Sequence, residues 1–110
     1  MTYDEIASMI ESTGLNNAYY QYPEGEAPDL PYILFYYPER DDFQADNKNY
    51  AKIPQLNIEL YTKEKDFEKE DLIEALLDAN DLAYDKEEQY IESEKMYEVL
   101  YTMEVIINES

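Results

Sequence analysis

The stretch between Pro31 and Pro38 constrains the fold of this chain more than any other. Six apolar or aromatic residues, YILFYY, follow one another there without a charge. A run this short, rich in aromatic and β-branched residues and closed by proline at both ends, is typical of a buried strand rather than a helix. We therefore expect a central strand over Pro31–Tyr37.

Two other segments on the N-terminal side indicate strands. The aromatic segment Ala18–Tyr22 ends at Pro23, and the loop Glu24–Asp29 separates it from the central strand. We expect these two strands to form a hairpin. Residues Tyr50–Tyr61 alternate apolar and polar side chains, which is the strand period, and Pro54 within them predicts a bulge or an edge position.

The C-terminal third predicts two more strands. We expect the first over Ala83–Ile91, a tight turn at Glu92–Lys95, and the second over Met96–Ile107. The second carries apolar side chains on both of its faces, as a strand in the middle of a sheet does.

Two helices complete the pattern. The first is predicted over Tyr3–Thr13, because Thr2 and Glu5 have capping-box spacing and Gly14 is a suitable stop. The second begins after Asp66 as N-cap and ends at Asn80-Asp81. Its predicted buried stripe is Leu72, Ile73, Leu76 and Leu77.

The resulting order is α-β-β-β-α-β-β. Strands in two groups with two helices between them indicate an α+β protein, with a mostly antiparallel sheet and both helices on one face. The 110 residues contain Gly 2 and Pro 5 and show no linker, so we expect a single domain over residues 1–110.

Charge is the strongest compositional feature. There are 27 acidic and 8 basic residues, a formal net charge of -19. Such a surface repels nucleic-acid backbones and anionic lipid, and it keeps copies of the chain apart until a specific contact forms. It indicates either plain solubility or a surface that lies near DNA without binding to it. With no apolar segment near 20 residues, we expect neither a secreted nor a membrane protein.

The residues of common catalytic sites are missing. The chain has no histidine and no cysteine, which excludes Ser-His and Cys-His nucleophile pairs and thiolate zinc sites. Neither glycine belongs to a phosphate-binding loop. We therefore expect no enzyme and no cofactor. We also expect no metal site, because Asp41, Asp42 and Asp46 lack the spacing of a calcium loop.

The polar segment Glu39–Asn49 is longer than a connection requires, which points to function. We expect it to contact a neighbouring subunit, with Phe43 as an apolar anchor, although Phe43 could equally fold back over the core. The predicted interface residues are Asp41, Asp42, Phe43, Asp46 and Tyr50.

Several segments resemble one family of proteins. They are residues 36–38 leading to 43–46, the strand Leu56–Thr62 followed by Lys65-Asp66, and the closing segment Tyr90–Val99. Together they are similar to tail terminator, or tail completion, proteins of long-tailed bacteriophages and of prophages in Gram-positive bacteria. The resemblance covers nearly the whole chain and agrees with the α+β element order. These segments are structural signatures rather than catalytic motifs.

The resemblance implies a structural protein of the virion, assembled in the host cytoplasm. Such proteins form a ring, commonly of six subunits, that caps the tail tube and faces the head connector. DNA passes through the ring as unbound cargo, and no membrane is involved.

Two alternatives from other classes stay open. One is an acidic decoy that mimics DNA and blocks a host DNA-binding protein, which would present carboxylates in rows on an outer face. The other is an enzyme that works with carboxylates alone, and it is remote, because among 27 acids some pair is always close.

Overall fold

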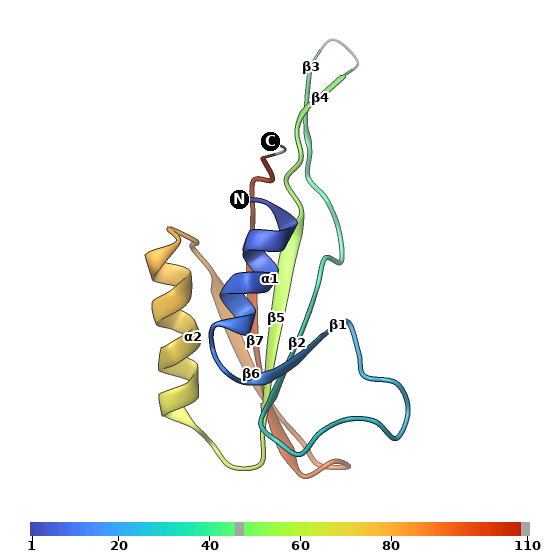
Figure 1. Cartoon of the computed structure of the whole chain (residues 1–110), viewed down its shortest axis with the longest axis vertical. Coiled ribbons are helices and arrows are strands. Elements are labelled where there is room, and N and C mark those ends of the chain that lie inside the picture. Colours follow the sequence, from blue (N-terminus) through green and yellow to red (C-terminus); the bar gives the residue numbers. More distant parts are fainter. Residues whose placement is uncertain (46–47, 109–110) are drawn as a thin grey trace.

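The computed structural model has two layers, a five-stranded sheet and two helices that cover one of its faces (Figure 1). It describes the backbone of residues 1–45 and 48–108, and the side chains of residues 1–42 and 51–108. Among the strands of the main sheet and the helices, the chain order is α-β-β-β-α-β-β. The predicted fold class is therefore confirmed.

Helix α1 (Tyr3–Glu11) has the predicted capping box, with Thr2 and Glu5 each accepting a hydrogen bond from the other's backbone N–H. Gly14, with φ of 77°, ends its last turn in the left-handed region that glycine adopts without strain. Helix α2 (Phe67–Ala79) begins at the predicted N-cap Asp66. In the described part of the chain, neither helix has the length and apolar character that a membrane crossing requires.

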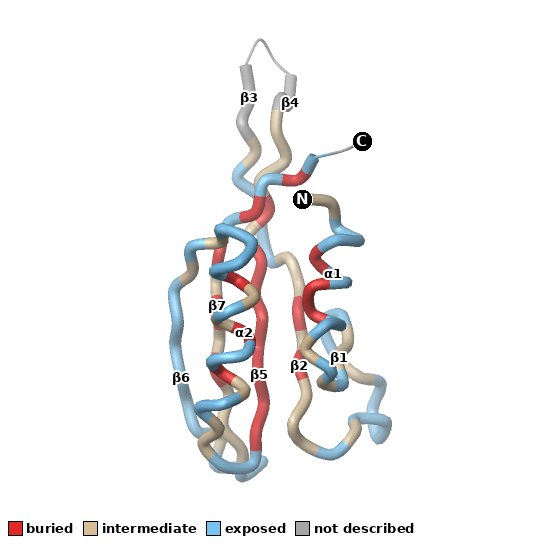
Figure 2. The backbone as a smooth tube through the Cα atoms, turned by 60° about the vertical axis from the view of Figure 1, so that its left-hand side comes forward, coloured by how far each residue is buried: buried red, intermediate tan, exposed pale blue. Residues whose placement is uncertain are grey.

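The main sheet contains β1 (Asn16–Tyr19), β2 (Tyr32–Tyr36), β5 (Gln55–Thr62), β6 (Asp85–Ile91) and β7 (Met96–Glu104). Their order across the sheet is β1-β2-β5-β7-β6. All neighbours are antiparallel except β1 and β2. The central position belongs to β5, in which residues 56–62 are all buried (Figure 2).

One face of the sheet and both helices enclose the core. In register across β2, β5 and β7, Phe35 lies opposite Ile58, and Ile58 lies opposite Tyr101. These side chains pack against buried residues of the helices, such as Ile6 and Ile73. The other face has no helix over it, and we call it the open face.

The expected hairpin between the first two strands is wrong, because β1 and β2 run parallel. A parallel pair needs a crossover of about a dozen residues, and residues 20–31 provide that length. Aromatic runs separated by a proline- and glycine-containing loop do not specify direction. Strand β1 also begins at Asn16, two residues before the predicted strand Ala18–Tyr22.

The predicted polar loop Glu39–Asn49 is a β-hairpin instead. Its strands are β3 (Phe43–Ala45) and β4 (Lys48–Ala51), and together they form a separate two-stranded sheet. Strands of three and four residues are too short for an alternating pattern to reveal. The hairpin projects from one end of the body (Figures 1 and 2), and the radius of gyration is 15.1 Å. A compact domain of this length has about 13 Å.

Candidate interaction surface

Residues 40–54, which contain the hairpin, are hereafter the arm. Its last residues still pair with the body, because the Lys52 and Pro54 carbonyls accept from the N–H groups of Ile107 and Val105. Its base continues the pairing of β2 and β5 beyond the main sheet. The Gln55 N–H donates to the Glu39 carbonyl at 2.8 Å, and the Asp41 N–H donates to the Ile53 carbonyl at 2.8 Å. Proline limits this ladder, since Pro54 has no N–H to donate and lies opposite Arg40 in a single bridge.

A charged pair reinforces the arm's base. The Arg40 guanidinium donates to both carboxylate oxygens of Asp42, and the Ile53 N–H donates to Asp42 Oδ1 at 3.1 Å. The hydrogen bond from Arg40 lowers the pKa of Asp42 against a smaller effect of burial, and the Ile53 bond adds to it. Asp42 therefore stays ionised and links the two sides of the arm.

The structure places Asp41, Asp42 and the backbones of Phe43 and Tyr50 on this one arm. Asp41 is exposed at its base, and Asp42 holds the pair just described. Phe43 begins β3, and its backbone lies opposite Ala51. The register then shifts, so that Tyr50 is the extra residue of a bulge in β4. Asp46 lies outside the described residues, as do the side chains of Phe43 and Tyr50.

A second surface lies along β1, at the edge of the main sheet. We call it the β1 edge, and its ring contacts involve Tyr3, Tyr19, Tyr20, Tyr36 and Tyr37. Tyr19 packs on the helix-covered side, 5.5 Å from the buried Phe35 ring, and is still 54% exposed.

Tyr20 flanks the same edge on the open face. Its ring packs 5.3 Å from that of Tyr36 and is 60% exposed. Its φ of 70° lies in the left-handed region, which costs a residue with a Cβ about 1–2 kcal/mol. Exposed tyrosines therefore stand on both sides of the β1 edge, one of them in a strained backbone conformation.

The open face holds a third feature, a chain of three hydrogen-bonded groups from β5 and β7. The Tyr61 hydroxyl is within hydrogen-bond distance of Glu59, and it lies 2.6 Å from Glu98 Oε2. Glu98 also accepts from Gln89 Nε2 on β6 at 2.7 Å. Glu59 is only 9% exposed, although no helix covers this face.

Burial and hydrogen bonding shift the pKa of Glu59 in opposite directions. A phenol carries one proton, so Tyr61 can donate to only one of the Glu59 and Glu98 carboxyls at a time. Burial raises the pKa of Glu59, hydrogen bonds from Tyr61 and Tyr36 lower it, and the nearby Glu98 charge raises it again, with a net upward shift. Glu59 therefore holds its proton more tightly than an exposed glutamate does.

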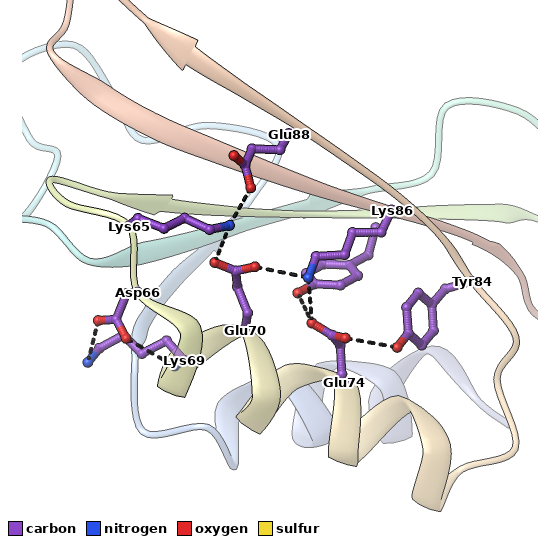
Figure 3. Close-up of polar contacts among 9 residues, drawn as sticks. Lys65, Asp66, Lys69, Glu70, Glu74, Tyr84, Lys86 and Glu88 are labelled. Atoms are coloured by element: carbon purple, nitrogen blue, oxygen red, sulfur yellow. Dashed lines mark hydrogen bonds and ion pairs between the residues drawn. The ribbon is translucent and has the colours of Figure 1, made fainter.

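The most extensive polar network fixes α2 to β6 (Figure 3). Glu70 is 2% exposed and lies 2.6 Å from Lys65 Nζ and 2.9 Å from Lys86 Nζ. Lys86 also contacts Glu74 at 2.9 Å, and Lys65 contacts Glu88. Glu70 thus occupies a buried position of α2, where the sequence predicted only the apolar stripe.

Glu74 extends this network into the core. Its carboxylate accepts from Tyr84 at 3.1 Å and from the buried Tyr101 at 2.8 Å. Burial would raise the pKa of Glu74, but hydrogen bonds from Lys86, Tyr101 and Tyr84 outweigh it and lower that pKa. Burial would lower the pKa of Lys86, but Glu70 and Glu74 raise it. These groups therefore keep fixed charges near neutral pH, which suits holding a helix and not transferring protons.

The prediction of a stripe through Leu72 is wrong, because Leu72 is 41% exposed. The network explains the difference: α2 is rotated so that Glu70 faces the sheet and pairs with lysines from the preceding loop and from β6. One sequence feature could have indicated the burial of Glu70: Lys86 is a single basic residue in the otherwise acidic segment of β6.

Within the described part of the chain, no group of acidic side chains comes together in a way that could hold a metal ion. The described surface does offer sheet edges and exposed tyrosine rings, and tyrosine is enriched at protein contacts. Comparison with models of known protein families found no match, and comparison with curated proteins found no significant relative.

Proposed function

We propose that this chain is a structural assembly protein of a phage or prophage tail, comparable to a tail terminator. In this role it forms a homo-oligomeric ring that caps the tail tube and joins it to the head connector. The observation that carries the proposal is the arm, which projects beyond a body that already encloses its own core.

A projecting two-stranded hairpin has little reason to form in isolation. Two strands alone are marginally stable in water, because they bury little apolar surface. The arm's base is nevertheless fixed by the Asp42 pair and by ladder hydrogen bonds at Asp41 and Gln55. A hairpin held in a defined direction and extending past its own domain supports a role in reaching a neighbouring subunit.

Charge supports the same role. Arm residues 40–54 contain three basic and three acidic residues and are formally neutral, so the net charge of -19 belongs to the rest of the chain. Bodies of like charge repel one another, whereas a neutral arm can approach a neighbour. An acidic ring wall would in turn let DNA pass without ion pairs to it.

The primary test is particle mass against salt concentration. Raising the salt from about 0.01 M to 1 M shortens the screening length from about 30 Å to about 3 Å. We expect light scattering after size exclusion to show growth toward a ring-sized species. A chain that stays single at every salt and concentration, and does not bind tail-tube protein, would contradict the proposal.

The arm itself can be tested by shortening it. Phe43 and Ala51 are directly opposed, so residues 44–50 can be replaced by Asn-Gly, a two-residue hairpin turn, which leaves the Lys52 carbonyl in place to accept from the Ile107 N–H. We expect this variant to fold and to lose association. A milder variant, Phe43→Ser, should weaken association with little change in the unfolding temperature of the monomer. Unchanged particle mass in both variants would eliminate the arm as the contact.

The DNA-decoy alternative has one observation in its favour. The edge strand β6 is exposed over residues 85–90, and Asp85 and Glu87 point to the open face about 7 Å apart. A decoy would remain monomeric or dimeric and bind a DNA-binding protein tightly. Binding of that kind, competed by duplex DNA and without ring growth, would favour this alternative over assembly.

A further inference from the structure

The two free edges of the main sheet differ in their charge. Strand β6 at one edge contains three acidic residues and one lysine in seven positions. Strand β1 at the other edge lies within residues 12–23, a run of twelve residues without a charge. In a chain that is 32% charged, this run gives a second copy a place to approach with little repulsion.

The β1 edge also has the features of a strand-receiving site. It ends the sheet order, so its outer side pairs with no described strand. Tyr19 and Tyr20 stand on its two sides, 54% and 60% exposed, and Tyr3 beside them is 41% exposed. Rings of this kind would cover an added strand from above and below, while backbone hydrogen bonds extend the sheet. Tyrosine is also enriched where protein contacts are strongest.

The exposed side chain of Tyr20 supports a contact function. Asparagine or glycine would adopt its φ of 70° more easily, yet a large aromatic residue is present and mostly exposed. Burial within this chain does not account for that residue, because Tyr20 stays 60% exposed although its ring contacts that of Tyr36. The backbone conformation itself belongs to a tight turn, in which the Gln21 N–H donates to the Tyr19 carbonyl at 2.8 Å, so it is the exposed aromatic side chain at this turn, and not the turn, that points to a contact.

We propose that the β1 edge receives the arm of a second copy of this chain, in described positions 40–45 and 48–54. The arm is formally neutral, like the uncharged edge, and it consists of strands that can pair edge to edge. It points away from the body along the long axis, whereas β1 lies on the body's side (Figure 1). The contact therefore joins two copies, with different surfaces on each, as a ring requires.

This inference rests on the proposed assembly function, and Tyr20→Asn tests it directly. Asparagine tolerates the left-handed conformation, so the monomer should keep its unfolding temperature. The contact surface, however, loses the aromatic side chain of Tyr20. We expect association to weaken at least tenfold. The matched control is Tyr90→Asn, which removes a 45%-exposed tyrosine from the acidic edge β6 and should change association less than twofold.

Disulfide trapping identifies the two surfaces, because the natural chain has no cysteine. Single-cysteine variants Gln44→Cys in the arm and Asn16→Cys in β1 would be mixed and oxidised. We expect at least tenfold more mixed dimer than from Gln44→Cys with Glu87→Cys in β6. An equal yield from β6, or full association of Tyr20→Asn, overturns the β1 assignment even if rings form. A wild-type chain that never associates overturns the assembly function as well.

Discussion

Replacing Glu70 by glutamine should destabilise the fold far more than an ordinary surface substitution on the same helix. The change keeps the shape but removes the charge that pairs with Lys65 at 2.6 Å and Lys86 at 2.9 Å. A broken buried ion pair costs about 3–5 kcal/mol. Lys65 and Lys86 are 23% and 36% exposed and keep Glu88 and Glu74 as partners. We therefore expect the lower end, about 3 kcal/mol.

The assay is urea unfolding followed by far-ultraviolet circular dichroism, since urea carries no charge and does not screen ion pairs. A loss of about 3 kcal/mol should lower the urea midpoint with an unchanged denaturant slope. In a separate thermal melt it should lower the unfolding temperature by roughly 10–15 °C. The control is Asp71→Asn, at the next, exposed position of α2, which should stay within about 0.5 kcal/mol. A Glu70→Gln loss below about 1 kcal/mol, or equal to that of the control, would refute the structural role of the network.

Three further outcomes follow from the packing and from the raised pKa of Glu59. Because that folded-state pKa lies above the unfolded value, Glu59 contributes most stability at low pH and loses it as pH rises through the folded pKa. In Glu59→Gln the unfolding free energy, relative to wild type, should therefore increase between pH 4 and pH 8, and urea titrations showing a constant difference would contradict this. Leu60→Ala, at a fully buried position of β5, should cost about 3–4 kcal/mol in the same assay, and a loss below about 1.5 kcal/mol would mean that the core is loosely packed. Tyr101→Phe should cost about 1–2 kcal/mol, because Glu74 keeps Lys86 and Tyr84 as partners, and no loss at all would show that the 2.8 Å hydrogen bond adds nothing.

The features that the sequence predicted correctly depend on local chemistry. Thr2 and Glu5 are three residues apart and form their capping box without help from the rest of the chain. Asp66 caps α2 in the same way. The alternation from Leu56 to Leu60 correctly indicates which side chains face the helices, because strand period alone decides it.

The features that it missed depend on distant segments. The direction of β1 is set by pairing with β2, and nothing in an aromatic run encodes it. Glu70 is buried because Lys65 and Lys86 meet it from a loop and a neighbouring strand. Glu59 has an ordinary outward position in the alternation, and its burial requires tyrosines of β2 and β5 around it. The segment Glu39–Asn49 was predicted as a loop, whereas its described residues include strands β3 and β4, and the interface role of Asp41, Asp42, Phe43, Asp46 and Tyr50 stays a prediction.

Because β5 is the central strand, local unfolding of the sheet should begin at the edge strands and not at β5. Its residues 56–62 are buried and hydrogen-bonded to β2 on one side and β7 on the other, so their amide protons should exchange with solvent most slowly. Strands β1 and β6 have a neighbour on one side only and should exchange faster. The sheet can then fray at both margins while its middle ladder persists, which allows the edges to rearrange against another surface at little cost to the whole domain.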